Sequence, residues 1–167
     1  CFPNRLEAIL ALQCAMVQNP DDARAPYYLG NLYYDKRQYD DAVACWERSR
    51  DLDPTFPTAH RNLALAYFNK YNRPQDALTE MEQAFALDET DARVLMELDQ
   101  LRKKLGMDAA TRLPLLEKYL PVVQKRDDLY LEYITLHNAL GRYEEAYQML
   151  MGRHFHPWEG GEGKVPA

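Results

Sequence analysis

The chain has 167 residues, of which 47% are hydrophobic and 28% are charged, so it can bury an interior beneath a charged surface. Its formal net charge is −6, spread along the sequence with no long block of one sign. This excludes the basic stripe that nucleic-acid binding requires. The sequence also lacks an apolar run of membrane-spanning length and a basic-then-apolar signal segment. We therefore expect neither a nucleic acid nor a membrane as partner.

The cysteines and the chain ends indicate the setting of the protein. Cys1, Cys14 and Cys45 show no paired metal spacing, and free thiols in helices fit a reducing cytoplasm. The chain begins Cys-Phe-Pro without an initiator Met and stops after a glycine-rich stretch. We expect a cytoplasmic piece of a longer protein.

The first predicted element is a helix within residues 4–22. Ala8, Leu12 and Ala15 recur at helical spacing, and Asn19-Pro20 closes the segment. Proline lacks the N–H that would continue a helix, so it is well tolerated just after a helix end.

Residues 23–56 and 57–91 repeat one pattern, each predicting two helices joined by a turn. Acidic residues open the second helix of each copy, where carboxylates face the positive end of the helix dipole. The period is close to 34 residues. With one residue inserted at the turn, the equivalent pairs are Leu29 and Leu63, Gly30 and Ala64, Tyr33 and Tyr67, Tyr34 and Phe68, Ala42 and Ala77, and Trp46 and Met81.

Two less regular copies follow. Residues 92–126 keep Leu95, Leu98 and Gly106, but Asp99 takes the place of the small residue where the helices cross. Residues 127–151 return to the pattern with Tyr130, Tyr133, His137, the turn at Gly141-Arg142, and Ala146.

Together these features resemble the tetratricopeptide repeat family. The resemblance implies an all-α, right-handed solenoid of about nine helices over residues 1–151, because a helix pair alone cannot bury its apolar stripe. Residues 4–22 would be a half repeat and 152–167 a non-repeat tail or linker.

The resemblance also implies a binding surface on a concave face lined by the first helices. Aromatic rings beside Asn and Arg suit an extended peptide or another domain of the same polypeptide, although the aromatics could equally pack between helices. The predicted partner-binding residues are Arg24, Tyr27, Asn31, Tyr34, Arg61, Asn62, Phe68, Arg93 and Gln100.

One family subclass grips the C-terminal carboxylate of chaperones with Lys, Asn and Arg side chains. Asn31 and Asn62 resemble its asparagines, and Arg93 could serve at a basic position. However, Tyr27 stands where the first clamp lysine would be, which leaves a carboxylate poorly paired. We therefore do not expect this clamp.

The tail from His154 to Lys164 is the one segment that does not read as repeat. His154, His156, Trp158 and Glu159 form a candidate site, either as a weak metal signal or as part of a linker that docks Phe155, Pro157 and Trp158 on the last helices. We predict no metal and no cofactor. The tail resembles a segment of large bacterial tetratricopeptide proteins with an uncharacterised N-terminal domain.

No nucleophile paired with a base stands out, so the chain is not expected to be an enzyme by itself. His60 and His137 fall within helix patterns, and Asp127-Asp128 fits a first helical turn. The leading hypothesis is a protein-interaction scaffold. The alternatives are a spacer, or an accessory part of a larger, carbohydrate-related enzyme to whose site residues 152–164 contribute.

Overall fold

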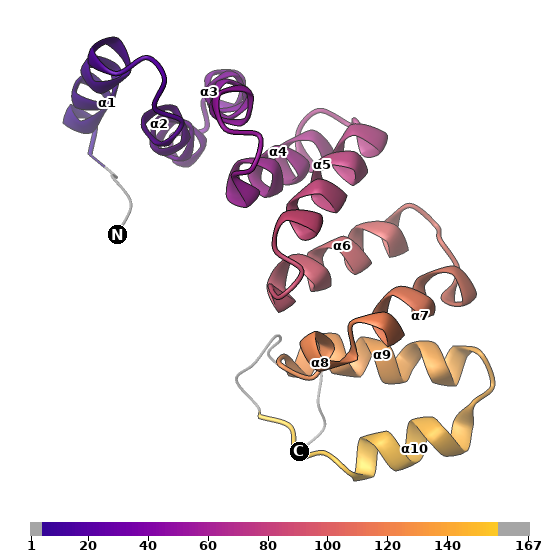
Figure 1. Ribbon diagram of the computed structural model, residues 1–167. Helices are drawn as coiled ribbons and strands as arrows, with labels where there is room; N and C mark the ends of the chain where they lie inside the picture. Colours follow the sequence, from indigo (N-terminus) through magenta and orange to yellow (C-terminus); the bar gives the residue numbers. More distant parts are fainter. Residues whose placement is uncertain (1–4, 157–167) are drawn as a thin grey trace. The chain divides into compact units, whose positions relative to one another are not determined.

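The computed structural model describes residues 5–156, and all regular structure in that range is helical (Figure 1). The chain forms two compact units, Cys1–Asp88 and Glu89–Ala167. The all-α prediction is confirmed. The helices are α1 (Glu7–Gln18), α2 (Arg24–Asp35), α3 (Tyr39–Leu52), α4 (Pro57–Asn69), α5 (Pro74–Leu87), α6 (Ala92–Lys104), α7 (Ala109–Lys118), α8 (Leu120–Val123), α9 (Asp127–Ala139) and α10 (Tyr143–Met151).

The described residues form ten helices where about nine were predicted, because the second half of residues 92–126 divides into α7 and α8. Tyr119, with φ −108° and ψ 32°, leaves helical geometry between them. Pro121 then lies in the first turn of α8, where a missing N–H costs no hydrogen bond.

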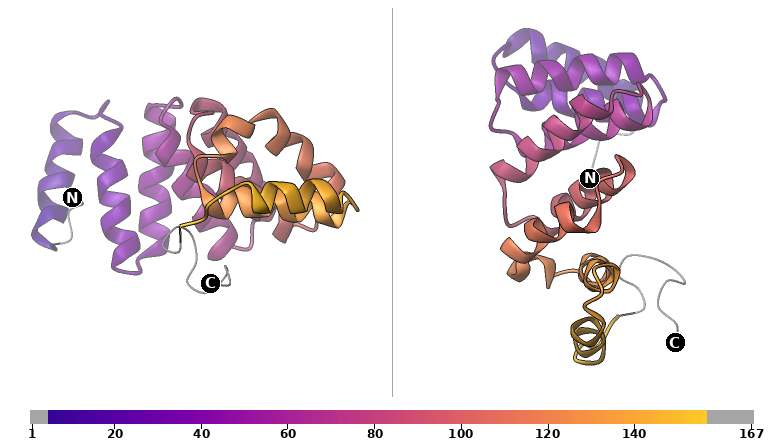
Figure 2. Two further views of the ribbon diagram at one scale, coloured as in Figure 1. Left: turned by 90° about the horizontal axis from the view of Figure 1, so that it is seen from below. Right: turned by 90° about the vertical axis from the view of Figure 1, so that its right-hand side faces the viewer.

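In the first unit, α1 packs on α2, α2 on α3, α3 on α4 and α4 on α5, so that neighbouring helices lie side by side (Figure 2). Gly30 of α2 lies against Trp46 of α3, and the packing leaves no room for a side chain at this position. A Cβ atom on Gly30 would lie 2.6 Å from Cδ1 and Nε1 of Trp46, so the buried indole rests on the bare backbone. The equivalent pair in α4 and α5 is Ala64 with Met81, both buried to 1% exposure.

Each turn within a helix pair uses one residue with left-handed backbone. The next residue donates its N–H back across the turn, as Gln38 does to the Tyr33 carbonyl oxygen at 2.9 Å. Glycine or asparagine adopts this conformation at little cost, whereas arginine is strained there. The four residues are Arg37 (φ 61°), Asn72 (φ 51°), Gly106 (φ 81°) and Gly141 (φ 77°).

In the second unit, Asp99 replaces the small crossing residue and forms a buried ion pair. Arg112 donates from Nε to Asp99 Oδ1 at 3.0 Å and from Nη2 to Oδ2 at 2.5 Å. The same Nη2 donates to Glu132 Oε1 at 2.7 Å. Asp99 is 1% and Arg112 4% exposed. A charge-assisted contact therefore joins α6 to α7 and α9 at a place where the first unit uses close packing.

No helix in the described part of the chain combines the length and the apolar character needed to cross a bilayer.

Candidate functional site

The predicted first-helix face contains a hydrogen-bonded pair of asparagines, Asn31 on α2 and Asn62 on α4, which we call the amide pair. Asn31 Oδ1 accepts from Asn62 Nδ2 at 2.9 Å. The same oxygen accepts from Trp46 Nε1, on α3, at 3.0 Å. Both asparagines are half-buried. Three helices thus meet at one carboxamide oxygen.

The chemistry of Trp46 determines which way both amides point. An indole N–H only donates, so Asn31 must turn its oxygen toward Trp46. Asn62 must then direct its NH2 group to that oxygen. The Asn31 NH2 group and the Asn62 oxygen bond no other described residue. Neither is among the fully buried polar atoms that have no partner, so both remain accessible. The amide pair therefore offers one donor and one acceptor.

The aromatic residues predicted for this face differ in burial. Tyr27 is only 8% exposed, and its ring packs edge-on against Phe56 at a centroid distance of 4.8 Å. Tyr34 is half-buried and lies 5.3 Å from the Trp46 ring. Phe68 is also half-buried. Tyr27 therefore belongs to the core, while Tyr34 and Phe68 keep part of their surface accessible.

The charged and polar candidates divide between the units. Arg24 is exposed and Arg61 half-buried in the first unit. Arg93 and Gln100 are exposed on α6 in the second unit, where Arg93 Nε donates to Glu97 Oε1 at 3.2 Å. The structure brings together Asn31, Asn62 and Tyr34. The sequence pattern aligned Trp46 only with Met81 of the next repeat, and it carried no signal that the indole N–H would bond Asn31.

The start of the tail is held by a buried carboxylate. Asp127, 1% exposed at the start of α9, accepts from Arg153 Nε at 2.8 Å and from the His156 backbone N–H at 2.7 Å. Burial alone would raise the pKa of Asp127, but the hydrogen bonds from His156 and Arg153 outweigh it and hold the pKa below its usual value. The Arg153 guanidinium carbon also lies 4.5 Å from the Tyr130 ring centroid.

The predicted tail residues fall partly within this arrangement. His154 and His156 have ring centroids 5.8 Å apart, and the Phe155 ring lies 6.4 Å from that of Tyr130. Trp158 and Glu159 lie outside the described residues, as does the predicted docking of Pro157. Over residues 5–156, no three His, Cys, Asp or Glu side chains are grouped so that they could hold a metal ion.

Comparisons with known proteins support the fold. Residues 30–70 match a family model described as TPR repeat. The structure is similar to the crystal structure of MamA, with a TM-score of 0.69 and 22% identity over 86% of this chain and 83% of that one. It is also similar to YrrB, described as a TPR protein with an unusual peptide-binding site, with a TM-score of 0.70 and 19% identity over 84% and 72%.

A further match is the first TPR of Spaghetti (RPAP3) bound to HSP90 peptide SRMEEVD. Its TM-score is 0.59, with 23% identity over 72% of this chain and 94% of that one. The chain therefore has the helix-pair fold of tetratricopeptide proteins.

Proposed function

We propose that the chain is a protein-interaction scaffold that binds an extended peptide, or a segment of another domain, along the faces of α2 and α4. The observation that carries the proposal is the amide pair. A peptide in extended conformation presents carbonyl oxygens and N–H groups along its length. The Asn31 NH2 group can donate to a carbonyl oxygen, and the Asn62 oxygen can accept from an N–H group.

Accessible edges of Tyr34 and Phe68 add apolar surface beside the amide pair, and Arg24 and Arg61 add positive charge on the same two helices. The descriptions of YrrB and of the RPAP3 domain mention peptide binding in the same fold. The burial of Tyr27 supports leaving out the chaperone-type carboxylate clamp, since its ring is committed to packing.

The proposal includes the repeat limits 4–22, 23–56, 57–91, 92–126 and 127–151. It also includes a cytoplasmic setting, a bacterial source, and a role within a larger polypeptide that is non-catalytic in this part. Arg93 and Gln100 would contribute a separate binding surface on α6.

A second candidate function is an accessory role in a larger enzyme, in which residues 152–164 contribute to a site on another domain. The buried Asp127 favours it, because three hydrogen bonds from the chain after α10, two from the Arg153 guanidinium and one from the His156 N–H, fix the start of this segment. His154 and His156 would then lie near the contact with the other domain, together with Trp158 and Glu159.

The test is selection of peptides from a displayed random library, followed by affinity measurement. The baits are the chain, Asn31→Ala/Asn62→Ala, and the control Gln83→Ala, which removes an exposed amide on α5. We expect selected peptides to bind the double variant at least about tenfold more weakly, because the donor of Asn31 and the acceptor of Asn62 are no longer there to bond the peptide backbone. Binding to the control should be unchanged. Equal affinity for all three baits would refute binding at the amide pair.

Truncation after Gly152 separates the second candidate. If an interaction of the full-length protein is lost on truncation but kept by Asn31→Ala/Asn62→Ala, the tail carries the function instead.

A further inference from the structure

A concave site lies at the turn ends of the two helix pairs in the first unit. It is a hollow of about 320 Å³ between the α2–α3 turn and the end of α4. None of its residues belongs to the predicted first-helix face. The lining residues are Arg37, Gln38, Tyr39, Asp40, Asp41, Lys70 and Tyr71.

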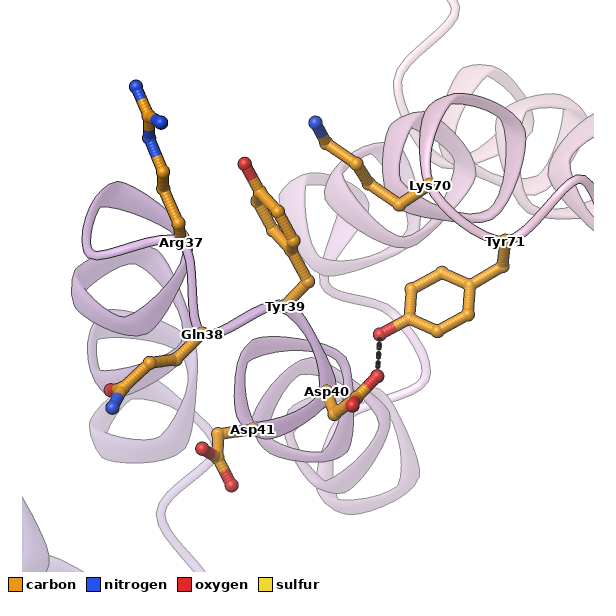
Figure 3. A pocket seen from close by; sticks show the side chains of 7 residues that line it. All are labelled: Arg37, Gln38, Tyr39, Asp40, Asp41, Lys70 and Tyr71. Carbon is orange, nitrogen blue, oxygen red and sulfur yellow. Dashed lines mark hydrogen bonds between the residues drawn. The ribbon is translucent and has the colours of Figure 1, made fainter.

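The charged groups of the hollow are sorted onto different sides (Figure 3). Arg37, Tyr39 and Lys70 direct their polar ends to the same side. Asp40 turns away from these three side chains and accepts a hydrogen bond from the Tyr71 hydroxyl at 2.5 Å. Asp41 points in the direction opposite to that of Arg37, Tyr39 and Lys70.

The tyrosines hold this separation in place. Burial, together with the Asp40 carboxylate, raises the pKa of Tyr71 to about 12, so its hydroxyl stays protonated and keeps donating to Asp40. The Tyr39 ring packs edge-on against Tyr34 at 5.1 Å and carries Lys70 Nζ 4.3 Å from its centroid. Lys70 is thereby positioned over an aromatic face rather than against a carboxylate.

The positive groups on the open side have no acidic partner in the described residues. Arg37 and Lys70 form no salt bridge there, and the Tyr39 hydroxyl makes no hydrogen bond, whereas the adjacent Lys36 is paired with Asp35 at 2.8 Å. In the next repeat, Arg73 is neutralised by Asp76 at 2.7 Å. Two cations flanking a phenol are therefore available for a ligand.

The backbone at Arg37 adds an independent indication. Its φ of 61° is the conformation for which the equivalent turns use Asn72, Gly106 and Gly141. An arginine is strained at this position, and glycine would relieve the strain. This chain therefore places an arginine here at a conformational cost.

We propose that this hollow binds a phosphate monoester carried on a polypeptide, such as a phosphorylated serine. The guanidinium of Arg37, the phenol of Tyr39 and the ammonium of Lys70 can each donate to one of the three terminal oxygens of a phosphate, whereas a carboxylate offers only two oxygens. The dianionic charge also suits two cations better than a single negative charge does.

The test uses the phosphoserine tripeptide acetyl-Gly-phosphoserine-Gly-amide, with its unphosphorylated form and inorganic phosphate as comparison probes. Binding is followed in two-dimensional ¹H–¹⁵N spectra of the chain. We expect a dissociation constant of about 1 mM for the phosphopeptide, with shifts at residues 37–41 and 70–71, and no shifts with the unphosphorylated peptide.

Three variants identify the binding groups. Arg37→Gly and Lys70→Ala should each weaken binding about tenfold, whereas Lys36→Ala, which removes a neighbouring charge outside the hollow, should change it about twofold or less. Arg37→Gly should also keep or raise the melting temperature, by up to about 3 °C, so its loss of binding cannot come from unfolding.

Three results would overturn the proposal. They are no binding at tens of millimolar probe, an equal effect of Lys36→Ala and Arg37→Gly, and binding of inorganic phosphate without binding of the phosphopeptide.

Discussion

His60, on α4, has an acceptor at each ring nitrogen. Nδ1 lies 2.6 Å from Glu80 Oε2 and Nε2 lies 2.9 Å from the Pro54 carbonyl oxygen. Both contacts are hydrogen bonds only when both nitrogens carry protons, so the imidazolium form satisfies the site. The hydrogen bond to Glu80 raises the pKa of His60, although burial opposes it. His60 lies within a helix, as its sequence pattern predicted.

This pair makes stability depend on pH. Because folding raises the pKa of His60 from its ordinary value of 6.5, its stabilisation is fully present below pH 6.5 and is lost as the pH rises through the folded-state pKa. Urea unfolding at pH 6 and pH 8 should show the loss in the wild-type chain. In Glu80→Gln the difference between the two pH values should shrink, and an unchanged difference would exclude His60 as its source.

Trp46 has two roles that one substitution can separate. Trp46→Phe keeps most of the apolar volume over Gly30 but removes the N–H that Asn31 accepts. We expect the free energy of unfolding to fall by about 1 kcal/mol or more, since the hydrogen bonds from Trp46 Nε1 to Asn31 Oδ1 and to the Tyr27 carbonyl oxygen, at 3.3 Å, are both lost. The Asn31 side-chain amide signals should shift and broaden in ¹H–¹⁵N spectra because the amide is no longer fixed. Unchanged Asn31 signals would show that Trp46 does not orient the pair.

At the scale of elements, the second unit depends on the buried pair between α6 and α7. Arg112→Ala leaves the carboxylate of Asp99 buried without its main partner, and we expect a loss of about 3–5 kcal/mol in unfolding free energy. The control Arg93→Ala breaks an i,i+4 pair between the exposed Arg93 and the half-buried Glu97, and it should cost about 1 kcal/mol or less. Urea unfolding measures both, and similar losses would contradict a special role for Arg112.

The double variant Asp99→Leu/Arg112→Met tests the same contact in another way. It removes both charges together and should recover most of the stability lost in Arg112→Ala, because apolar side chains of similar volume can replace a buried pair. Failure to recover would indicate that Glu132 also needs the Arg112 guanidinium.

The contact between α9 and the tail can be followed at a single amide. The His156 N–H donates to Asp127 Oδ2, so its hydrogen exchange should be slow. In Asp127→Ala we expect exchange at His156 to accelerate at least about tenfold, while amides inside α9 keep their protection. The control Asp128→Ala changes the adjacent acid, which pairs with Arg126 instead. Equal acceleration in both variants would mean that Asp127 does not anchor the tail.

At the scale of the molecule, most of the helix arrangement could be predicted from sequence, for local reasons. Gly30 with Trp46 and Ala64 with Met81 recur in register, and the turns at Gly106 and Gly141 contain the residue that left-handed backbone favours. The break between α7 and α8 was missed because Pro121 tolerates a first helical turn and therefore does not by itself say where a helix ends.

The candidate site was harder to predict, because its geometry joins residues far apart in sequence. Asn31 and Asn62 could be assigned to one face from the repeat, but their orientation depends on Trp46, a residue that the pattern places in the core. Asp127 was expected in a first helical turn, where it lies. Its burial depends on Arg153 and His156, which follow it by 26 and 29 positions.

The central claim is that a peptide binds at the amide pair. The most direct measurement is the ¹H–¹⁵N spectrum of the side-chain NH2 groups during titration with a peptide selected on the chain. The account predicts that the Asn31 and Asn62 signals shift in a saturable manner, with Asn31 most affected because its NH2 group is free to donate, while exposed Asn138 on α9 stays unchanged. Saturable binding that leaves both signals unmoved would place the peptide elsewhere and contradict the account.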